Sequence, residues 1–241
     1  MDLDQFLTQN PFLPWSRSHW LPVAIAGLLG AICIFLAKKY LSRMGQKRFL
    51  LALSLIPCAC YFIYLTIKIR SGDFTIQDDL PVHLCRFLAL MGPYVYWSEH
   101  KVWTGIFYFW IVVGTLNALV AVDLKYDFPH WSYILYFTLH STLVLLPIYF
   151  CLVLGHRVER KDLWNAFLAT NVFLLVAFVV NTAIGSNYLY VAHKPEVSSL
   201  LDYLGPWPWY VLALEFIGLL LFIVAYLPFG IFKKNHLGDN N

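Results

Sequence analysis

Long apolar stretches recur along the chain, and each is followed by a short polar connection. A helix that crosses the hydrocarbon core of a bilayer needs about 20 mostly apolar residues. We therefore expect an all-α fold, a polytopic membrane bundle of seven transmembrane helices, and the short connections favour one integral membrane domain over residues 1–241. The predicted spans are about 20–37, 49–69, 81–97, 102–122, 132–154, 163–184 and 208–231.

The composition supports a membrane protein and excludes a soluble globular one. Of the 241 residues, 60% are hydrophobic and 13% are charged, whereas soluble domains are about 45–50% apolar and about 25% charged. The basic residues are scattered among the connections and form no stripe, so we expect no nucleic-acid partner. The expected partner is membrane phospholipid, and nothing in the sequence indicates an oligomeric state.

Lysine and arginine residues are distributed unequally between the two sides of the predicted bundle. The connections after the first, third and fifth spans and the tail after the seventh hold eleven of them, and the opposite side holds five. Cytoplasmic loops carry the excess of these residues. The bias predicts that the N-terminus lies outside and the C-terminus in the cytoplasm.

Five of the seven spans carry polar side chains near the end that is predicted to lie outside. Ionisable side chains inside a membrane are costly, so they usually face the bundle interior or a hydrated cavity. We therefore predict a polar cavity that opens toward the outer leaflet. The alternative is that each side chain makes only an interhelical hydrogen bond, worth about 0.6–2 kcal/mol. The side chains are His83, Cys85, Arg86, Asn117, His140, Asn181 and Glu215.

The segment "DDLPVHLCRF" (residues 78–87) places an imidazole, a thiol and a guanidinium at the start of the third span. With Pro81 as the first helical residue, His83 and Arg86 would be neighbours on one face, and Cys85 would point elsewhere. A base for Cys85 would then come from another helix, and His140 is the candidate. Cys85 could be a nucleophile, since a helix N-terminus and Arg86 favour a thiolate, or it could only pack.

Two further features bear on what the cavity would bind. Arg86 cannot lose its proton, so it needs either a carboxylate such as Glu215 or the phosphate of a lipid headgroup. The long outer connection, residues 185–210, is rich in proline and aromatic residues. It is expected to form either an ordered cap, whose Asn187 and Tyr188 reach the mouth of the cavity, or an amphipathic interfacial anchor.

Four motifs spread over the third to the seventh span give the chain a family resemblance. They are "LPVHLC" (80–85), "LHSTLVLLPIY" (139–149), "NTAIGSNYLYVAHKP" (181–195) and "LGPWPWY" (204–210). The chain resembles the bacterial YwaF-type integral membrane proteins and, more distantly, the animal transmembrane protein 164 family. The resemblance implies a seven-span fold in a bacterial plasma membrane. For the animal members it also implies phospholipid acyl transfer through a cysteine nucleophile assisted by histidine.

His83 and His140 match the histidines of that pattern, but the cysteine does not. The animal pattern has its cysteine directly before the first histidine, where this chain has Val82, and the nearest thiol is Cys85. Three interpretations follow. Cys85 substitutes for the missing cysteine, the two histidines serve a different reaction, or this branch has lost the chemistry.

We therefore expect a lipid-modifying enzyme that transfers or hydrolyses phospholipid acyl groups, with catalytic residues His83, His140 and Cys85. The expected substrate-binding residues are Arg86, Asn117, Asn181, Asn187, Tyr188 and Glu215. No cofactor and no metal are expected. The alternatives are a non-catalytic transporter or lipid-binding protein, and a metal site built from His83, His140 and either Glu215 or His193.

Overall fold

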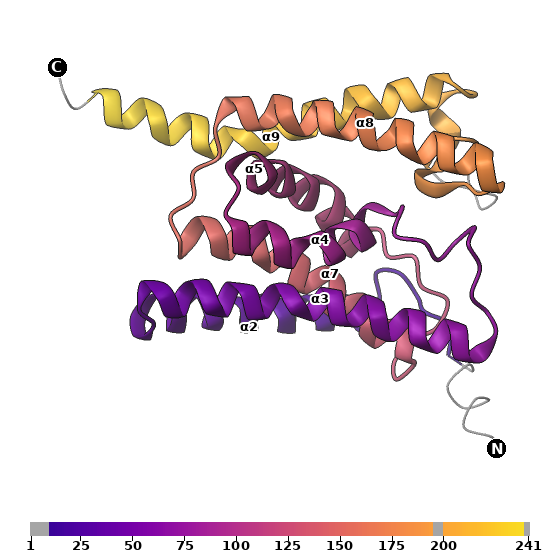
Figure 1. The fold of residues 1–241 in the computed structure, drawn as a ribbon, viewed down its shortest axis with the longest axis horizontal. Coiled ribbons are helices and arrows are strands. Elements are labelled where there is room, and N and C mark those ends of the chain that lie inside the picture. Colours follow the sequence, from indigo (N-terminus) through magenta and orange to yellow (C-terminus); the bar gives the residue numbers. More distant parts are fainter. Residues whose placement is uncertain (1–9, 195–199, 239–241) are drawn as a thin grey trace.

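The computed structural model describes residues 10–194 and 200–238, and these residues form helices joined by short connections (Figure 1). One isolated antiparallel bridge joins Pro11 to Tyr126 within the described part. The α-helices are α2 (Arg17–Tyr40), α3 (Arg43–Ser71), α4 (Leu84–Ser98), α5 (Lys101–Phe109), α6 (Leu116–Val120), α7 (Trp131–Leu152), α8 (Arg160–Ile184) and α9 (Trp209–Gly238). A π-helical segment, η1 (Trp110–Thr115), joins α5 to α6, and the 3₁₀ turns η2 (Tyr188–Tyr190) and η3 (Leu200–Leu204) precede α9.

Six helices of the described chain are long and apolar enough to cross a membrane, which confirms the prediction of an all-α membrane protein. They are α2, α3, the continuous helix from α5 through α6, α7, α8 and α9. The remaining predicted span, 81–97, corresponds to α4. With 15 residues, α4 is about 22 Å long, shorter than the hydrocarbon core of about 30 Å.

The prediction that this helix starts at Pro81 is wrong. Helix α4 starts at Leu84, and His83 is its N-cap residue with extended backbone angles. The reason is that side chains bind the preceding backbone. Arg86 donates to the Asp78 carbonyl and, at 3.5 Å, to the Leu80 carbonyl, which a helix from Pro81 would bond to the Leu84 amide. The Leu80 amide donates to the Tyr188 hydroxyl at 3.0 Å.

The helices run antiparallel along the sequence, as the ribbon shows (Figure 1). Two contacts fix this direction for the short helix α4. Lys47, at the start of α3, pairs with Glu99 directly after α4 at 2.5 Å, and Tyr64, late in α3, accepts a hydrogen bond from Arg86 at the start of α4. Helix α4 thus runs back along α3, and the chain begins α2 and ends α9 at opposite ends of the bundle.

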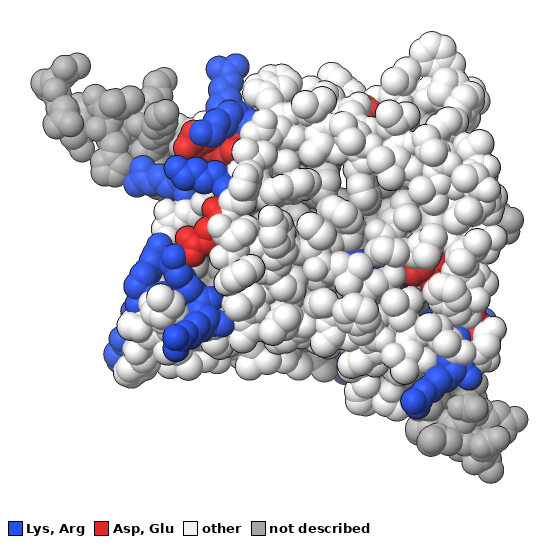
Figure 2. Space-filling model, in the orientation of Figure 1, with Lys and Arg blue, Asp and Glu red and all other residues white. Residues whose placement is uncertain are grey.

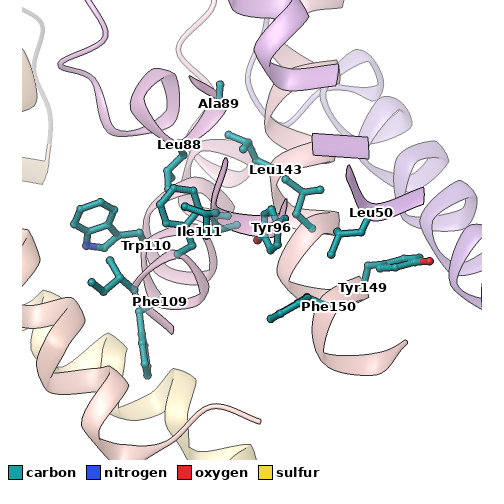
Figure 3. Packing of buried hydrophobic residues seen from close by; sticks show 14 of the residues in the cluster. Leu50, Leu88, Ala89, Tyr96, Phe109, Trp110, Ile111, Leu143, Tyr149 and Phe150 are labelled. Carbon is teal, nitrogen blue, oxygen red and sulfur yellow. The ribbon is translucent and has the colours of Figure 1, made fainter. Parts of the chain in front are cut away.

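The core lies where α3, α4, η1 and α7 meet, and Figure 3 shows its aromatic and aliphatic side chains converging on that centre. Leu88, Ala89 and Val95 of α4 are completely buried, as are Ile111 of η1 and Leu143 of α7. The apolar faces of α2 and α8 are mostly exposed instead. A helix buried in protein needs apolar side chains, just as a helix buried in lipid does. For this reason the sequence of α4 resembles that of a membrane span.

Charged side chains gather at the two ends of the bundle and leave a wide uncharged band between them (Figure 2). Most of the lysine and arginine side chains visible in this view lie at the end where α2 meets α3 and α8 begins. We call this end the basic end. The distribution agrees with the unequal counts in the sequence.

Gly105 in α5 provides a test of how closely α5 and α8 pack. A Cβ atom at this position would lie 2.5 Å from Cγ of Asp162, which is 3% exposed and hydrogen-bonds the start of α8. We expect Gly105→Ala to lower the free energy of unfolding by about 1–3 kcal/mol, as overpacking does. Thermal unfolding in detergent micelles measures this.

Gly218→Ala in α9 is the matched control, because nothing lies within 4 Å of the added Cβ atom. Alanine has the higher helix propensity, so this variant should unfold at or above the wild-type temperature. Equal melting temperatures for the two variants would show that α5 and α8 are not in close contact.

Candidate functional site

A cavity of about 660 Å³ lies at the end of the bundle away from the basic end, between the end of α3, the start of α4, α6 and α7. Five of the side chains predicted for the site line it. They are His83, Cys85, Arg86, Asn117 and His140. Residues from three separate predicted spans thus line one cavity, as expected from their positions near the same end of those spans.

His140 is held by its own helix, α7. Its Nδ1 atom lies 2.8 Å from the carbonyl oxygen of Tyr136, one turn earlier, and the two rings are 4.1 Å apart between centroids. A carbonyl oxygen only accepts, so in the neutral ring the proton is on Nδ1, and Nε2 is left as an acceptor. Within the described residues, Nε2 has no protein hydrogen-bond partner. His140 is therefore set up to accept a proton from a ligand.

His83 precedes α4 and is supported from the outer connection. Its ring contacts the ring of Tyr188 edge to face, with centroids 5.0 Å apart. Tyr188 is 1% exposed; its hydroxyl donates to the Ile76 carbonyl at 2.7 Å and accepts from the Leu80 amide. Burial raises the pKa of the Tyr188 hydroxyl, which keeps it protonated as a donor. Tyr188 was predicted to bind substrate. Its hydroxyl instead hydrogen-bonds these two backbone groups, and its ring positions His83.

Cys85 lies on the first turn of α4, with its Sγ atom 3.7 Å from the Thr115 hydroxyl of η1. In a regular helix Cys85 would point away from His83. This expectation does not hold here, because His83 lies outside the helix. Both side chains line the cavity, together with His140. The thiol thus shares its space with two imidazoles.

Arg86 pairs with Asp79 and not with Glu215, the carboxylate considered from the sequence. Its Nη2 atom lies 3.9 Å from the Asp79 carboxylate and donates to the Tyr64 hydroxyl at 3.1 Å. The guanidinium also lies over the Tyr64 ring, 4.8 Å from its centroid. These contacts hold Arg86 against α3.

The Asp79 carboxylate is completely buried and is the centre of a charged cluster. It accepts hydrogen bonds from the Tyr64 hydroxyl and, at 2.9 Å, from the Thr75 amide, and Lys68 lies 3.6 Å away. We call these residues the Asp79 cluster: Tyr64, Lys68, Thr75, Asp79 and Arg86. One carboxylate faces two cations in this cluster, and the Asp78 carboxylate accepts from its Thr75 hydroxyl. Tyr64 and Arg86 line the cavity, as does Asp123.

Four of the predicted site residues do not line this cavity: Tyr188, described above, and Asn181, Asn187 and Glu215. Asn181, 2% exposed, accepts from the Ser186 hydroxyl and the Tyr188 amide and donates to the Tyr188 carbonyl, so it closes the end of α8. Asn187 bonds to His193 within the outer connection. Glu215 accepts from Asn171 at 2.8 Å and lines a neighbouring cavity of about 410 Å³. Residues 195–199 of the predicted outer connection lie outside the described residues.

The geometry gives no support to the metal alternative. Across residues 10–194 and 200–238, no group of three or more histidine, cysteine or acidic side chains is placed to bind one ion. Glu215 and His193 do not line the cavity that holds the two histidines. The polar groups that line this cavity are imidazole, thiol, amide, guanidinium, carboxylate and hydroxyl groups.

Three residues at the cavity were not predicted from the sequence. Tyr64 and Asp123 line it, and Asp79 lies behind Tyr64 and Arg86. Tyr61 and Tyr64 stand three apart, and both reach Asp79, at its carbonyl and its carboxylate respectively. A pair of tyrosines on one helix face near a span end was the available signal.

The Asp79 cluster leads to a stability prediction. Asp79→Ala leaves Lys68 and Arg86, whose side chains are 24% and 20% exposed, without their shared carboxylate. We expect a loss of about 2–3 kcal/mol, less than for a fully buried pair because both cations keep some access to water. Asp78→Ala is the control, since its exposed carboxylate accepts one hydrogen bond from the Thr75 hydroxyl. Thermal unfolding of both variants measures the difference, and equal melting temperatures would contradict the role given to Asp79.

Comparison with known proteins places these observations in a family. No curated protein and no solved structure matches the chain. The model of the TMEM164 family matches residues 14–226, a range that includes all the helices that line the cavity and most of α9. The motifs around His83 and His140 both fall within this range. The chain therefore belongs to the TMEM164 family.

Proposed function

We propose that the chain is a membrane-embedded enzyme that transfers or hydrolyses phospholipid acyl groups. One observation carries the proposal: His83, Cys85 and His140, which come from two separate helical segments, line one cavity of about 660 Å³. Nucleophilic acyl chemistry needs a nucleophile, a base and a group that stabilises negative charge on oxygen. Membership of the TMEM164 family is consistent with a membrane protein.

The proposed base is Nε2 of His140, because the Tyr136 carbonyl holds the proton on Nδ1. Nε2 takes the proton from the Cys85 thiol, or from water, as the sulfur or oxygen attacks the ester carbonyl of the lipid. The ester C–O bond then breaks, and the imidazolium returns the proton to the leaving lysolipid oxygen. With Cys85 as nucleophile, a second lipid hydroxyl or a water would take the acyl group from the thioester.

His83 and Arg86 have supporting roles in this proposal. His83 is the candidate donor to the oxyanion, since both ends of the Asn181 amide are occupied elsewhere. The guanidinium of Arg86, which lines the cavity, would bind the lipid phosphate at the cavity wall. Asn117 lines both this cavity and the neighbouring one, so it would contact the substrate between them.

We propose a seven-span topology in the bacterial plasma membrane, with the N-terminus outside. Helices α3 and α5 run in the same direction, so the segment that contains α4 returns across the bundle between them. The basic end would face the cytoplasm. The cavity would then open to the outer leaflet, away from cytosolic acyl-CoA, which favours acyl exchange between membrane lipids.

A second candidate is a lipid-binding protein or transporter without turnover. The observation that favours it is the π-helical segment η1, which interrupts a spanning helix beside two adjacent cavities. Transporters commonly bind their substrates at such interrupted helices. In this case His140 would contribute to binding and no lipid product would form.

His140→Ala distinguishes the two candidates. Removal of a general base costs about 100- to 10,000-fold in rate, so acyl transfer or release should fall by at least about 100-fold. Purified protein in phosphatidylethanolamine and phosphatidylglycerol liposomes with a labelled acyl chain gives the rate by mass spectrometry of the lipids. His100→Ala is the matched control, because His100 begins α5 at the basic end and makes no side-chain cap.

Equal lipid products from wild type and His140→Ala would contradict the enzymatic proposal and leave the binding candidate.

If His140→Ala does abolish activity, Cys85→Ala identifies the nucleophile of the reaction. Loss of activity in this variant assigns the nucleophile to the thiol, and retained activity assigns it to water or a substrate hydroxyl.

The proposed orientation has its own test. Alkaline phosphatase is active only outside the cytoplasm, so a fusion after Ile231 should be inactive, and a fusion in the connection that holds η2 should be active. Green fluorescent protein at the same two sites should give the opposite result. The reverse pattern would invert the topology and place the cavity in the inner leaflet.

A further inference from the structure

A second, larger cavity lies at the basic end, remote from the site described above. Its volume is about 820 Å³, and it is lined by the end of α7, the connection after it, the start of α8 and the second half of α9. No residue of the proposed catalytic site lines it. A role for this cavity must therefore be argued from its own side chains.

One part of the cavity wall is basic. Arg157, Arg160 and Lys161 line it together with a single acidic side chain, Glu159. Glu159 pairs with Lys161 at 2.9 Å and also caps the backbone at the start of α8. Among the described residues, neither guanidinium has an ion-pair partner. Two arginine side chains thus remain able to bind an anion bidentately.

The connection that carries Arg157 is held in place by the neighbouring helices. Arg43 of α3 donates to the Leu154 carbonyl at 2.8 Å, and the His156 ring packs at a tilt against Phe150 with centroids 4.6 Å apart. Gly155 allows the sharp turn between them, with φ of +68°. The basic wall is therefore built on an ordered segment.

The other part of the wall is apolar and belongs to the spanning helices. Leu152 of α7 and Tyr226, Pro228 and Phe229 of α9 line it, and Phe229 packs edge to face on Tyr108 with centroids 5.4 Å apart. A small hydrophilic anion would leave this surface unused. A ligand with a phosphate at one end and a hydrocarbon chain at the other would contact both parts.

We propose that this cavity binds an anionic phospholipid from the leaflet at the basic end, with its phosphate at Arg157 and Arg160 and its acyl chain along α9. The site differs from the general attraction of loop lysines and arginines to anionic lipid, because it combines two arginines with a hollow apolar wall. It does not depend on the proposed reaction at the other end.

The test compares matched pairs of charge changes in the detergent-solubilised full chain. Native mass spectrometry measures the binding of dioleoyl phosphatidylglycerol to wild type, R157Q/R160Q and K38Q/K39Q. Lys38 and Lys39 lie in the last turn of α2 at the same end and do not line the cavity. We expect about 30-fold weaker binding for R157Q/R160Q, which corresponds to about 1 kcal/mol per basic side chain, and less than about threefold for K38Q/K39Q.

Two further titrations identify the ligand. Dioleoyl phosphatidylcholine has the same phosphate but a choline cation that offsets its charge, so R157Q/R160Q should weaken its binding less than that of phosphatidylglycerol. Equal melting temperatures of the three proteins show that the variants are folded. Inorganic phosphate at the same concentration should not displace phosphatidylglycerol. Equal losses of phosphatidylglycerol binding in both double variants would show that only the general positive charge of this end attracts the lipid. Displacement of the lipid by phosphate would show that the site binds a free anion. Either result overturns the proposal.

Discussion

The end of the bundle that holds the cavity of His83 and His140 depends on the burial of one carboxylate. Asp79 has no exposed surface, and an unpaired charge in that position would cost several kcal/mol. Its partners come from both sides: Tyr64 and Lys68 from the end of α3, and Arg86 from the start of α4. The hydrogen bonds and ion pairs of Asp79 thus link α3 to α4 and fix the short segment between Asp79 and α4. His83 lies in that segment, so the position of its ring follows from the charge cluster.

The level of His83 and His140 along the bundle could be predicted from the sequence, whereas rotation about each helix axis could not. Counting along the spans placed His83, His140, Asn181 and Glu215 at a similar level, and the first two do share a cavity. Asn181 and Glu215 lie on helices that approach from another side. In a soluble helix the polar face would have shown the rotation, but lipid and protein interior are equally apolar. Nothing in these spans therefore marks which face meets the bundle.

The start of α4 shows a different limit of sequence reasoning. A proline at the first helical position is a sound local rule, and Pro81 satisfies it. The rule failed because Arg86 binds the Leu80 carbonyl, which a helix from Pro81 would bond to the Leu84 amide, and Tyr188 holds the Leu80 amide. Tyr188 follows Leu80 by more than one hundred residues. Competition from such distant side chains cannot be read from a short window of sequence.

The π-helical segment η1 has a consequence for how chains of this family can change in length. Its wide turn, in which the Leu116 amide bonds to the Ile111 carbonyl, contains one residue more than an α-helix would. Deleting a residue there would restore α geometry and leave the helix beyond it in nearly the same rotation, because the wide turn already absorbs the extra residue. The same deletion in a regular helix would rotate everything beyond it by about 100°. A chain one residue shorter at this turn would therefore keep Asn117 in the wall between the two cavities.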